Sequence, residues 1–154
     1  MLFDLNTDSN YIDKDNQFDF VIIGAGAAGI TIAKKLMDYG NKIALLEGGG
    51  EDYSDESQDC YKGEVLGDPY FDLDHSRLRY FGGSTNHWSG WCRGFEKIDF
   101  ERGYLGDEYE WPLKFDEINK YRKEACEILE IPNDFYDVKQ STKIKKIKFQ
   151  FSPP

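Results

Sequence analysis

A chain of 154 residues is long enough to fold as one domain with its own core, and its 40% hydrophobic and 16% aromatic content excludes a disordered chain. Its net charge of -10 argues against nucleic acid or an anionic membrane surface as a partner. Three widely spaced cysteines, Cys60, Cys92 and Cys126, fit neither a disulfide framework nor a zinc site, so we expect free thiols.

Residues 1–17 form a polar, acidic lead-in to the first predicted strand. They lack the basic and apolar regions of a signal peptide, and no apolar run reaches the length of a membrane span. We therefore expect a cytoplasmic protein without membrane insertion. A short basic run at residues 143–148 is interleaved with isoleucines, which favours a solvated strand face over a nucleic-acid patch.

Residues 18–47 have the pattern of a βαβ unit. Residues 20–23 are an apolar run typical of a strand buried on both faces of a parallel sheet. Residues 24–29 form a glycine-rich turn that opens a helix, and residues 42–46 predict a second buried strand that is closed by Glu47. The sequence therefore predicts an α/β fold with a Rossmann-like core and a parallel sheet.

Glycines in the first turn have the spacing of the dinucleotide fingerprint. Gly24 permits the tight turn, Gly26 lets the backbone approach a pyrophosphate, and Gly29 lets the helix pack closely on the strand. Two further positions expected in this part of the site are Ala27 and Ala28. The alternative is a structural turn that binds nothing.

Glu47 stands where an acid hydrogen-bonds the ribose hydroxyls of a bound dinucleotide. Its charge would repel the 2′-phosphate of NADP, so NADP is disfavoured. NAD and FAD both remain compatible with this part of the sequence.

Two amphipathic helices are predicted from apolar spacing. The first runs to about residue 39 and stops at Gly40, and its apolar stripe is Ile32, Ala33, Leu36 and Tyr39. The second lies between residues 111 and 132, with Ile118, Tyr121, Ala125 and Ile128 expected to be buried. Residues 48–74 predict an irregular segment. Residues 147–151 alternate like a strand with one buried face, for which the sequence offers no partner strand.

Residues 77–92 concentrate functional groups in one loop. Arg79 can neutralise a phosphate. Gly82 and Gly83 let the backbone pass close to a flat or charged group. His87, taken alone, is more typical of a hydrogen-bonded structural histidine. The chain has two histidines and no cysteine pair at ligand spacing, so no metal site is predicted.

These motifs resemble those of the glucose-methanol-choline (GMC) family of flavin-dependent oxidoreductases. The resemblance rests on DFVIIGAGAAG, LLEGGG, RLRYFGGSTNHWSGWC and a WP pair followed by a helix. It extends from residue 18 to the C-terminus. It implies that residues 18–154 are the N-terminal portion of a FAD/NAD(P)-binding Rossmann-like domain, truncated relative to the full family domain.

The resemblance implies FAD as the cofactor, with its ADP half on the first glycine turn and its ribose on Glu47. The loop with the Gly-Gly pair would wrap the pyrophosphate and the flavin end. Several family members have a histidine at the spacing of His87 that is bonded covalently to the flavin, whereas others bind FAD noncovalently, and both remain open here. The positions that the resemblance assigns to this second loop are Arg79, Gly82, Gly83, Ser84, Asn86 and His87.

For a complete enzyme, the resemblance implies oxidation of the CH–OH group of a sugar or other alcohol, with hydride transfer to the flavin. Family members carry a late His-His or His-Asn pair that accepts the hydroxyl proton. No histidine follows His87, so no catalytic residue is predicted here. Expected partners are the alcohol or sugar substrate and a complementing chain or an electron-acceptor protein. Two alternatives are a noncatalytic remnant or split half that binds FAD or a partner chain without turnover, and an NAD-linked dehydrogenase.

Overall fold

The computed structural model describes residues 2–7, 17–101, 103, 106–135 and 147–153. The chain divides into two compact units, Met1–Trp88 (unit 1) and Ser89–Pro154 (unit 2). Most of the basic run at residues 143–148 lies outside the described residues. In the described part of the chain, none of the helices combines the length and apolarity needed to cross a membrane.

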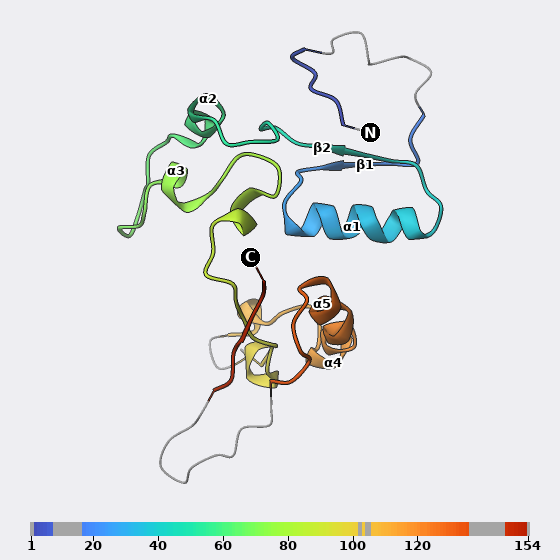
Figure 1. Ribbon diagram of the computed structural model, residues 1–154. Helices are drawn as coiled ribbons and strands as arrows, with labels where there is room; N and C mark the ends of the chain where they lie inside the picture. Colours follow the sequence, from blue (N-terminus) through green and yellow to red (C-terminus); the bar gives the residue numbers. More distant parts are fainter. Residues whose placement is uncertain (1, 8–16, 102, 104–105, 136–146, 154) are drawn as a thin grey trace. The chain divides into compact units, whose positions relative to one another are not determined.

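Unit 1 contains the predicted βαβ unit. Strands β1 (Phe20–Ile23) and β2 (Ile43–Leu46) pair in parallel, with Phe20 opposite Ile43. Helix α1 (Ala27–Asp38) connects them and lies along one face of the pair (Figure 1). This arrangement confirms the α/β class and corresponds to part of a Rossmann-like fold.

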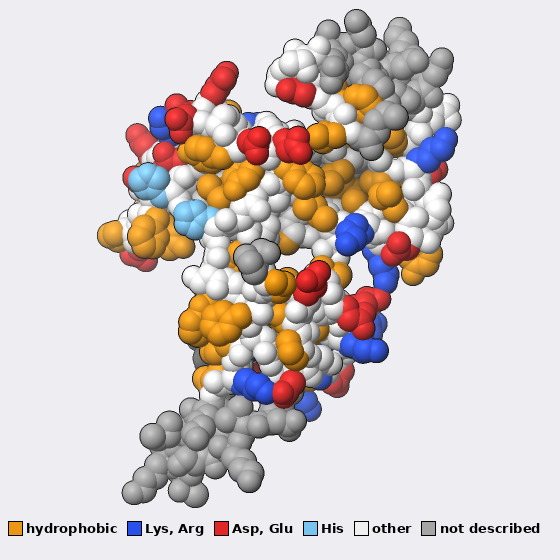
Figure 2. Space-filling model, in the orientation of Figure 1, with side chains coloured by type: hydrophobic (Ala, Val, Ile, Leu, Met, Phe, Trp, Pro, Cys, Tyr) orange, Lys and Arg blue, Asp and Glu red, His pale blue; other side chains and the backbone are white. Residues whose placement is uncertain are grey.

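The strands are not buried on both faces as their apolar runs predict. Ile22 faces α1, because a Cβ built on Gly29 would lie 3.4 Å from Ile22 Cγ2. Alternate residues therefore face away from α1, and there Val21 is 57% exposed and Ile23 85% exposed. Leu46, opposite Ile23, is 45% exposed. Figure 2 shows hydrophobic side chains gathered over this region. Among the described residues, one helix covers one face of a two-stranded sheet, and the side chains of the other face are exposed.

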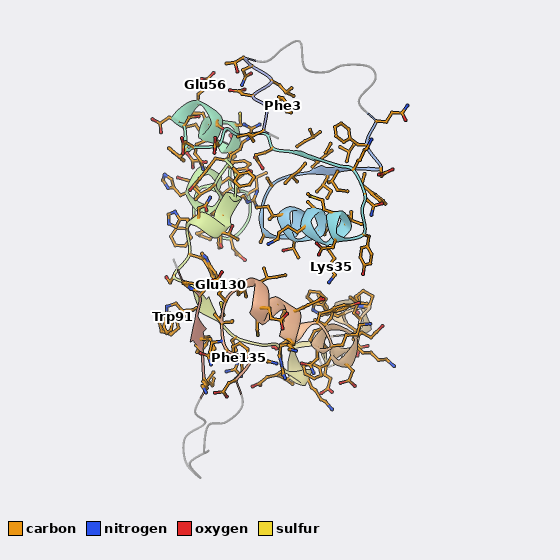
Figure 3. The ribbon with its side chains drawn as sticks, turned by 45° about the vertical axis from the view of Figure 1, so that its right-hand side comes forward. Phe3, Lys35, Glu56, Trp91, Glu130 and Phe135 are labelled. Carbon is orange, nitrogen blue, oxygen red and sulfur yellow. The ribbon has the colours of Figure 1, made fainter. Side chains whose placement is uncertain are left out.

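Helix α1 ends where the sequence predicts. Gly40 follows it with a φ of 82°, in the left-handed region that glycine adopts without strain. Ala33 is buried as predicted, whereas Ile32 and Tyr39 are 50% and 76% exposed. Figure 3 shows Lys35 on the side of α1 that faces away from the strands. The apolar stripe is wider than the surface that β1 and β2 offer it.

The segment between β2 and the Gly-Gly pair contains short helices instead of being irregular throughout. They are α2 (Asp55–Gln58), the 3-10 turn η1 (Asp59–Tyr61) and α3 (Leu73–Ser76). The Ser54 hydroxyl accepts a hydrogen bond from Ser57 N–H and so caps α2. A serine followed by two acids, Asp55 and Glu56, is a helix-start signal that the apolar pattern alone did not reveal.

In unit 2, the predicted second helix is two helices, α4 (Phe115–Asn119) and α5 (Arg122–Ile128). Tyr121 N–H donates to Ile118 O, 3.0 Å away and three residues earlier, which interrupts the α-helical pattern. The predicted buried face is wrong at Tyr121 and Ile128, which are 55% and 53% exposed, and at Ala125, which is also exposed. The core of unit 2 consists instead of Cys92, Cys126, Ile131 and Phe135.

The C-terminal strand has a partner, contrary to expectation. Strand β4 (Gln150–Phe151) pairs antiparallel with β3 (Trp91–Cys92). Phe149 and Phe151 pack edge-on against Trp91, at ring-centroid distances of 5.5 and 4.7 Å, but stay 41% and 58% exposed. Gln150 is half-buried and donates to Asp134 O at 2.6 Å. The side of residues 149–151 that carries Phe149 and Phe151 was predicted to be buried, but it is more exposed than the side that carries Gln150.

The remaining short elements are 3-10 turns. They are η2 (Gly83–Asn86) in unit 1 and η3 (Lys97–Asp99) and η5 (Asp107–Tyr109) in unit 2. All three cysteines are free thiols, as predicted: Cys60 is exposed, and Cys92 and Cys126 are buried.

Candidate functional site

The first glycine turn has the geometry that its spacing predicts. Gly24 has a φ of 98°, and its N–H donates to Leu46 O at 2.7 Å, which joins the turn to the end of β2. A Cβ on Gly29 would lie 1.9 Å from Gly24 O, so α1 approaches β1 more closely than any side chain permits. A Cβ on Gly26 would meet no atom within 4 Å, which leaves open space in front of this residue.

Helix α1 presents its N-terminus to that space. Gly26 is the N-cap residue and provides no side chain to accept the first helical N–H groups. Ala27 and Ala28 are exposed, and the first turn contains no acidic residue. Unsatisfied N–H groups and the helix dipole both favour an anion at such a position.

The Glu47 carboxylate lies directly against the glycine turn. Its Oε2 accepts the N–H of Ala25 at 2.8 Å, and its Oε1 accepts the N–H of Gly49 at 3.0 Å. Glu47 is half-buried. The acid therefore stands beside the N-terminus of α1, at the place predicted for a ribose contact.

Tertiary structure brings the second glycine loop to the first. Gly82 forms an isolated parallel bridge with Gly26, and its N–H donates to Ala25 O at 2.8 Å. Gly82 and Gly83 have φ values of 89° and 57°. A Cβ on Gly83 would lie 3.6 Å from the Cα of Gly26. The two glycine motifs therefore form one continuous backbone surface next to the helix terminus.

A third glycine segment, residues 48–50, was not among the predicted site residues and adds to this backbone surface. A Cβ on Gly48 would lie 2.6 Å from Arg79 Nη2, and one on Gly49 would lie 2.1 Å from Arg79 O. Gly50 O accepts the N–H of Phe81 at 2.9 Å. The run of three glycines directly after Glu47 was the available signal, because adjacent glycines permit two backbone segments to pass in contact.

Arg79 is held within unit 1. Its Nη1 donates to Ser57 Oγ at 2.9 Å, and its backbone N–H donates to Gln58 Oε1 at 3.1 Å. Gln58 is 5% exposed and also donates from Nε2 to the carbonyls of Asp74 and Arg77, at 2.5 and 2.6 Å. Ser57 and Gln58 thus organise the loop before the Gly-Gly pair, and no sequence pattern marked either residue.

The other predicted residues of the second loop shape its turn. Ser84 Oγ accepts the N–H of Leu78 at 3.2 Å, and Asn86 Nδ2 donates to Phe81 O at 2.8 Å. His87 is exposed and lines a small hollow at the edge of the turn. All the predicted site residues are described and belong to unit 1. The side chains of Ser84 and Asn86 hydrogen-bond to backbone groups within their own loop.

One further group of possible metal ligands lies beside this loop. Among the described residues, Asp72, Asp74 and His75 place ligand atoms within 4.8 Å of one another. The first turn of α3 carries Asp74. The group was not predicted, since the sequence places no histidine or cysteine pair there.

The fold and the convergent glycine turns together define unit 1 as part of a Rossmann-like α/β unit. No family model matches the chain. An oxygen-dependent choline dehydrogenase of Pseudomonas putida is 53% identical to it over 38 residues, which are 24% of this chain and 7% of that enzyme. The corresponding Pseudomonas fluorescens enzyme matches to the same extent.

A longer but weaker similarity is to a 2-methyl-1,2-propanediol dehydrogenase of Mycolicibacterium austroafricanum. It is 27% identical over 130 residues, covering 71% of this chain and 24% of that enzyme. The chain therefore spans between 7% and 24% of the length of these relatives.

Proposed function

We propose that unit 1 binds FAD and is the N-terminal, cofactor-binding portion of a GMC-type oxidoreductase that acts on CH–OH groups of sugars or other alcohols. One observation carries the proposal: Gly26 and Gly82 meet at the uncapped N-terminus of α1. Glycine residues from two chain segments beside a helix terminus allow a pyrophosphate to approach backbone N–H groups closely.

The residues present fit a dinucleotide. Gly26 has open space where a Cβ would stand, and the first turn of α1 carries no acid that would repel phosphate. Glu47 lies at the adjacent corner, where its carboxylate can accept hydrogen bonds from a ribose diol. In this proposal the glycine turns hold the pyrophosphate, Glu47 holds the ribose, and the loop from Gly82 to His87 borders the flavin end.

The relatives support the oxidoreductase part of the proposal. The choline and propanediol enzymes are both dehydrogenases of alcohols by name. Bound FAD would supply the hydride acceptor, and this chain would supply binding and orientation. Because the chain spans at most 24% of these relatives, substrate oxidation belongs to a complete protein in this proposal.

His87 is the proposed point of covalent attachment to FAD. It follows η2 directly and is exposed, so its ring is accessible to a ligand along the second loop. Denaturing the FAD complex in acid tests this attachment. Yellow colour that stays with the protein, and is released in His87→Ala, supports a covalent bond. Complete release from the wild-type chain rejects it.

The proposal is tested by FAD binding to the full 154-residue chain. We expect bound flavin in the visible spectrum and quenched flavin fluorescence on titration. Gly26→Ala should weaken FAD binding by about tenfold or more, because its methyl group fills the space meant for the pyrophosphate. Gly63→Ala is the matched control, since its Cβ would make an ordinary 3.5 Å contact with Leu73.

Both variants should melt like the wild type, which separates binding from folding. A folded chain that binds neither FAD nor ADP would refute the proposal, as would equal FAD affinity in Gly26→Ala and Gly63→Ala.

A second candidate is a split half that binds FAD together with a partner chain and does not turn over alone. The open face of β1 and β2, with Ile23 85% exposed, favours it. Retained flavin without reduction of an electron-acceptor dye by any alcohol would support this candidate. Dye reduction by the isolated chain would exclude it.

A further inference from the structure

The two histidines of the chain meet at one hollow beside the Gly-Gly loop. His75 comes from α3 and His87 follows η2, and Arg77 and Ser84 line the same space. Figure 2 shows two pale blue histidine side chains close together on one face. The volume of about 100 Å³ is below the roughly 300 Å³ of sites that enclose whole drug-sized ligands. A single small group fits this space, and a nucleotide does not.

The side chains that line the hollow are mainly hydrogen-bond donors. Arg77 offers a guanidinium fork, and the two imidazole rings offer ring N–H groups. Ser84 Oγ already accepts the N–H of Leu78, so its hydroxyl hydrogen can be donated to a ligand. This donor set is suited to an oxyanion.

Arg77 and Arg79 differ in a way that the sequence does not show. The Arg79 guanidinium is bonded to Ser57 and packs on Gly48. Among the described residues, no hydrogen bond or ion pair engages the Arg77 guanidinium. Its backbone is nevertheless fixed, because Arg77 O accepts a hydrogen bond from the buried Gln58 at 2.6 Å. Arg77 is therefore the arginine of this loop that is available to a ligand.

Nearby negative charge lies outside the hollow. Asp72 and Asp74 bring carboxylate oxygens within 4.8 Å of a ring nitrogen of His75, but neither belongs to the lining. Arg77 is the permanent positive charge of the lining.

We propose that this hollow is a binding site for one phosphate-sized oxyanion, anchored by Arg77 and completed by Ser84 and the two histidines. The anion is either a free phosphate or the phosphate of a nucleotide bound on the adjacent glycine surface, and in the second case the hollow replaces the glycine turns as the phosphate site and His87 is not the point of flavin attachment. The second source rests on the proposed FAD site, whereas the first does not.

Titration of the full chain with inorganic phosphate tests the site. The chain has two histidines, so their ring resonances in NMR report directly on the hollow. We expect both to shift saturably with phosphate, and Arg77→Gln to raise the phosphate Kd by about tenfold. Lys62→Gln is the matched control, since Lys62 is an exposed cation of unit 1 paired with Asp59.

Arg77→Lys keeps the charge but loses the fork, and it should bind with an intermediate Kd. Circular dichroism checks that each variant is folded. Competition between phosphate and FAD, with both weakened in Arg77→Gln, identifies the nucleotide as the source. Simultaneous binding identifies a free oxyanion.

Phosphate binding without FAD binding would support the site while refuting the FAD proposal. The site is refuted if phosphate leaves both histidine resonances unmoved, or if Arg77→Gln binds phosphate like Lys62→Gln.

Discussion

The two units of this chain are built on opposite principles. Unit 1 is organised by backbone contacts at glycine: Gly29 against Gly24, Gly49 against Arg79, and Gly83 against Gly26. Unit 2 is organised by side chains, with a buried cluster of Cys92, Cys126, Ile131 and Phe135 and with two groups of aromatic contacts, one around Trp91 and one around Phe100. Unit 1 is therefore joined by contacts between backbone segments, whereas unit 2 is joined by contacts between side chains.

This difference bears on the cofactor site that we propose in unit 1. The joined glycine segments lie beside the N-terminus of α1, where we propose that a pyrophosphate binds, and the far face of β1 and β2 is exposed. Burial of side chains forms the core of unit 2. Variants that disturb the glycine backbone contacts of unit 1 or the side-chain packing of unit 2, but not both, test this comparison.

Gly29→Ala should have the largest effect, confined to unit 1. Its Cβ would overlap Gly24 O at 1.9 Å, so α1 must move off β1, at a cost of about 3 kcal/mol or more. Thermal melting and hydrogen exchange of β1 and β2 measure the loss. Gly63→Ala serves as the control. Melting of Gly29→Ala like the wild type would show that the helix and strand do not need this contact.

Gln58→Ala should destabilise unit 1 by about 1–3 kcal/mol, because three backbone groups lose their hydrogen bonds to this buried side chain. The Arg79 amide should exchange faster with solvent, since it loses its acceptor. Unit 2 should be unaffected because its core cluster contains unit 2 residues alone. Lys62→Gln is the control, and an unchanged Arg79 exchange rate would contradict the role assigned to Gln58.

The thiols of unit 2 should respond to alkaline pH. Burial raises the pKa of the Cys126 thiol, an effect that nearby Arg122 lessens and Cys92 reinforces. Below about pH 8.5 the thiol is protonated in both the folded and the unfolded state, so pH has no effect through it. As pH rises further, the unfolded thiol ionises first, so the stability of unit 2 falls until the folded thiol also ionises.

Denaturant unfolding of unit 2 between pH 8 and 10 measures this loss. Cys126→Ala should make the stability of unit 2 less dependent on pH over this range, although it lowers stability at every pH by opening a small cavity.

Exposed Cys60 should react with a thiol reagent well before Cys92 and Cys126 in the native chain. Equal reaction of all three cysteines would mean that the core of unit 2 is open.

Glu130→Gly should have the smallest effect and should stabilise unit 2. Glu130 has a φ of 54° at the end of α5 (Figure 3). Ile131 N–H bonds to Cys126 O and Glu130 N–H to Glu127 O, the Schellman pattern in which glycine is preferred. We expect a gain of about 0.5–1 kcal/mol in the free energy of unfolding. Glu130→Ala, which keeps the Cβ, should give no such gain.

Local patterns in the sequence predicted much of unit 1 correctly. The apolar runs predicted β1 and β2 within one residue, and the helical spacing predicted the end of α1 within one residue. The start of α1 was wrong, because the helix begins at Ala27, inside the predicted turn. The roles predicted for Gly24 and Gly29 follow from chain geometry alone. Gly24 forms the tight turn with a positive φ, and Gly29 lies where a Cβ would overlap the backbone of that turn. Burial was less predictable, because whether Ile23 or Tyr39 is covered depends on neighbouring elements and not on its own spacing.

The sequence by itself determined the βαβ unit, its parallel pairing and the free thiols, because these depend on local propensity and on few contacts. Only the tertiary structure decided that Gly82 meets Gly26, that Gln58 holds the intervening loop, and that Arg79 is occupied while Arg77 is available. Those facts depend on where distant segments meet. The spacing of residues in the sequence predicts on which face of a helix or strand a residue lies. It does not predict which other residues pack against that face.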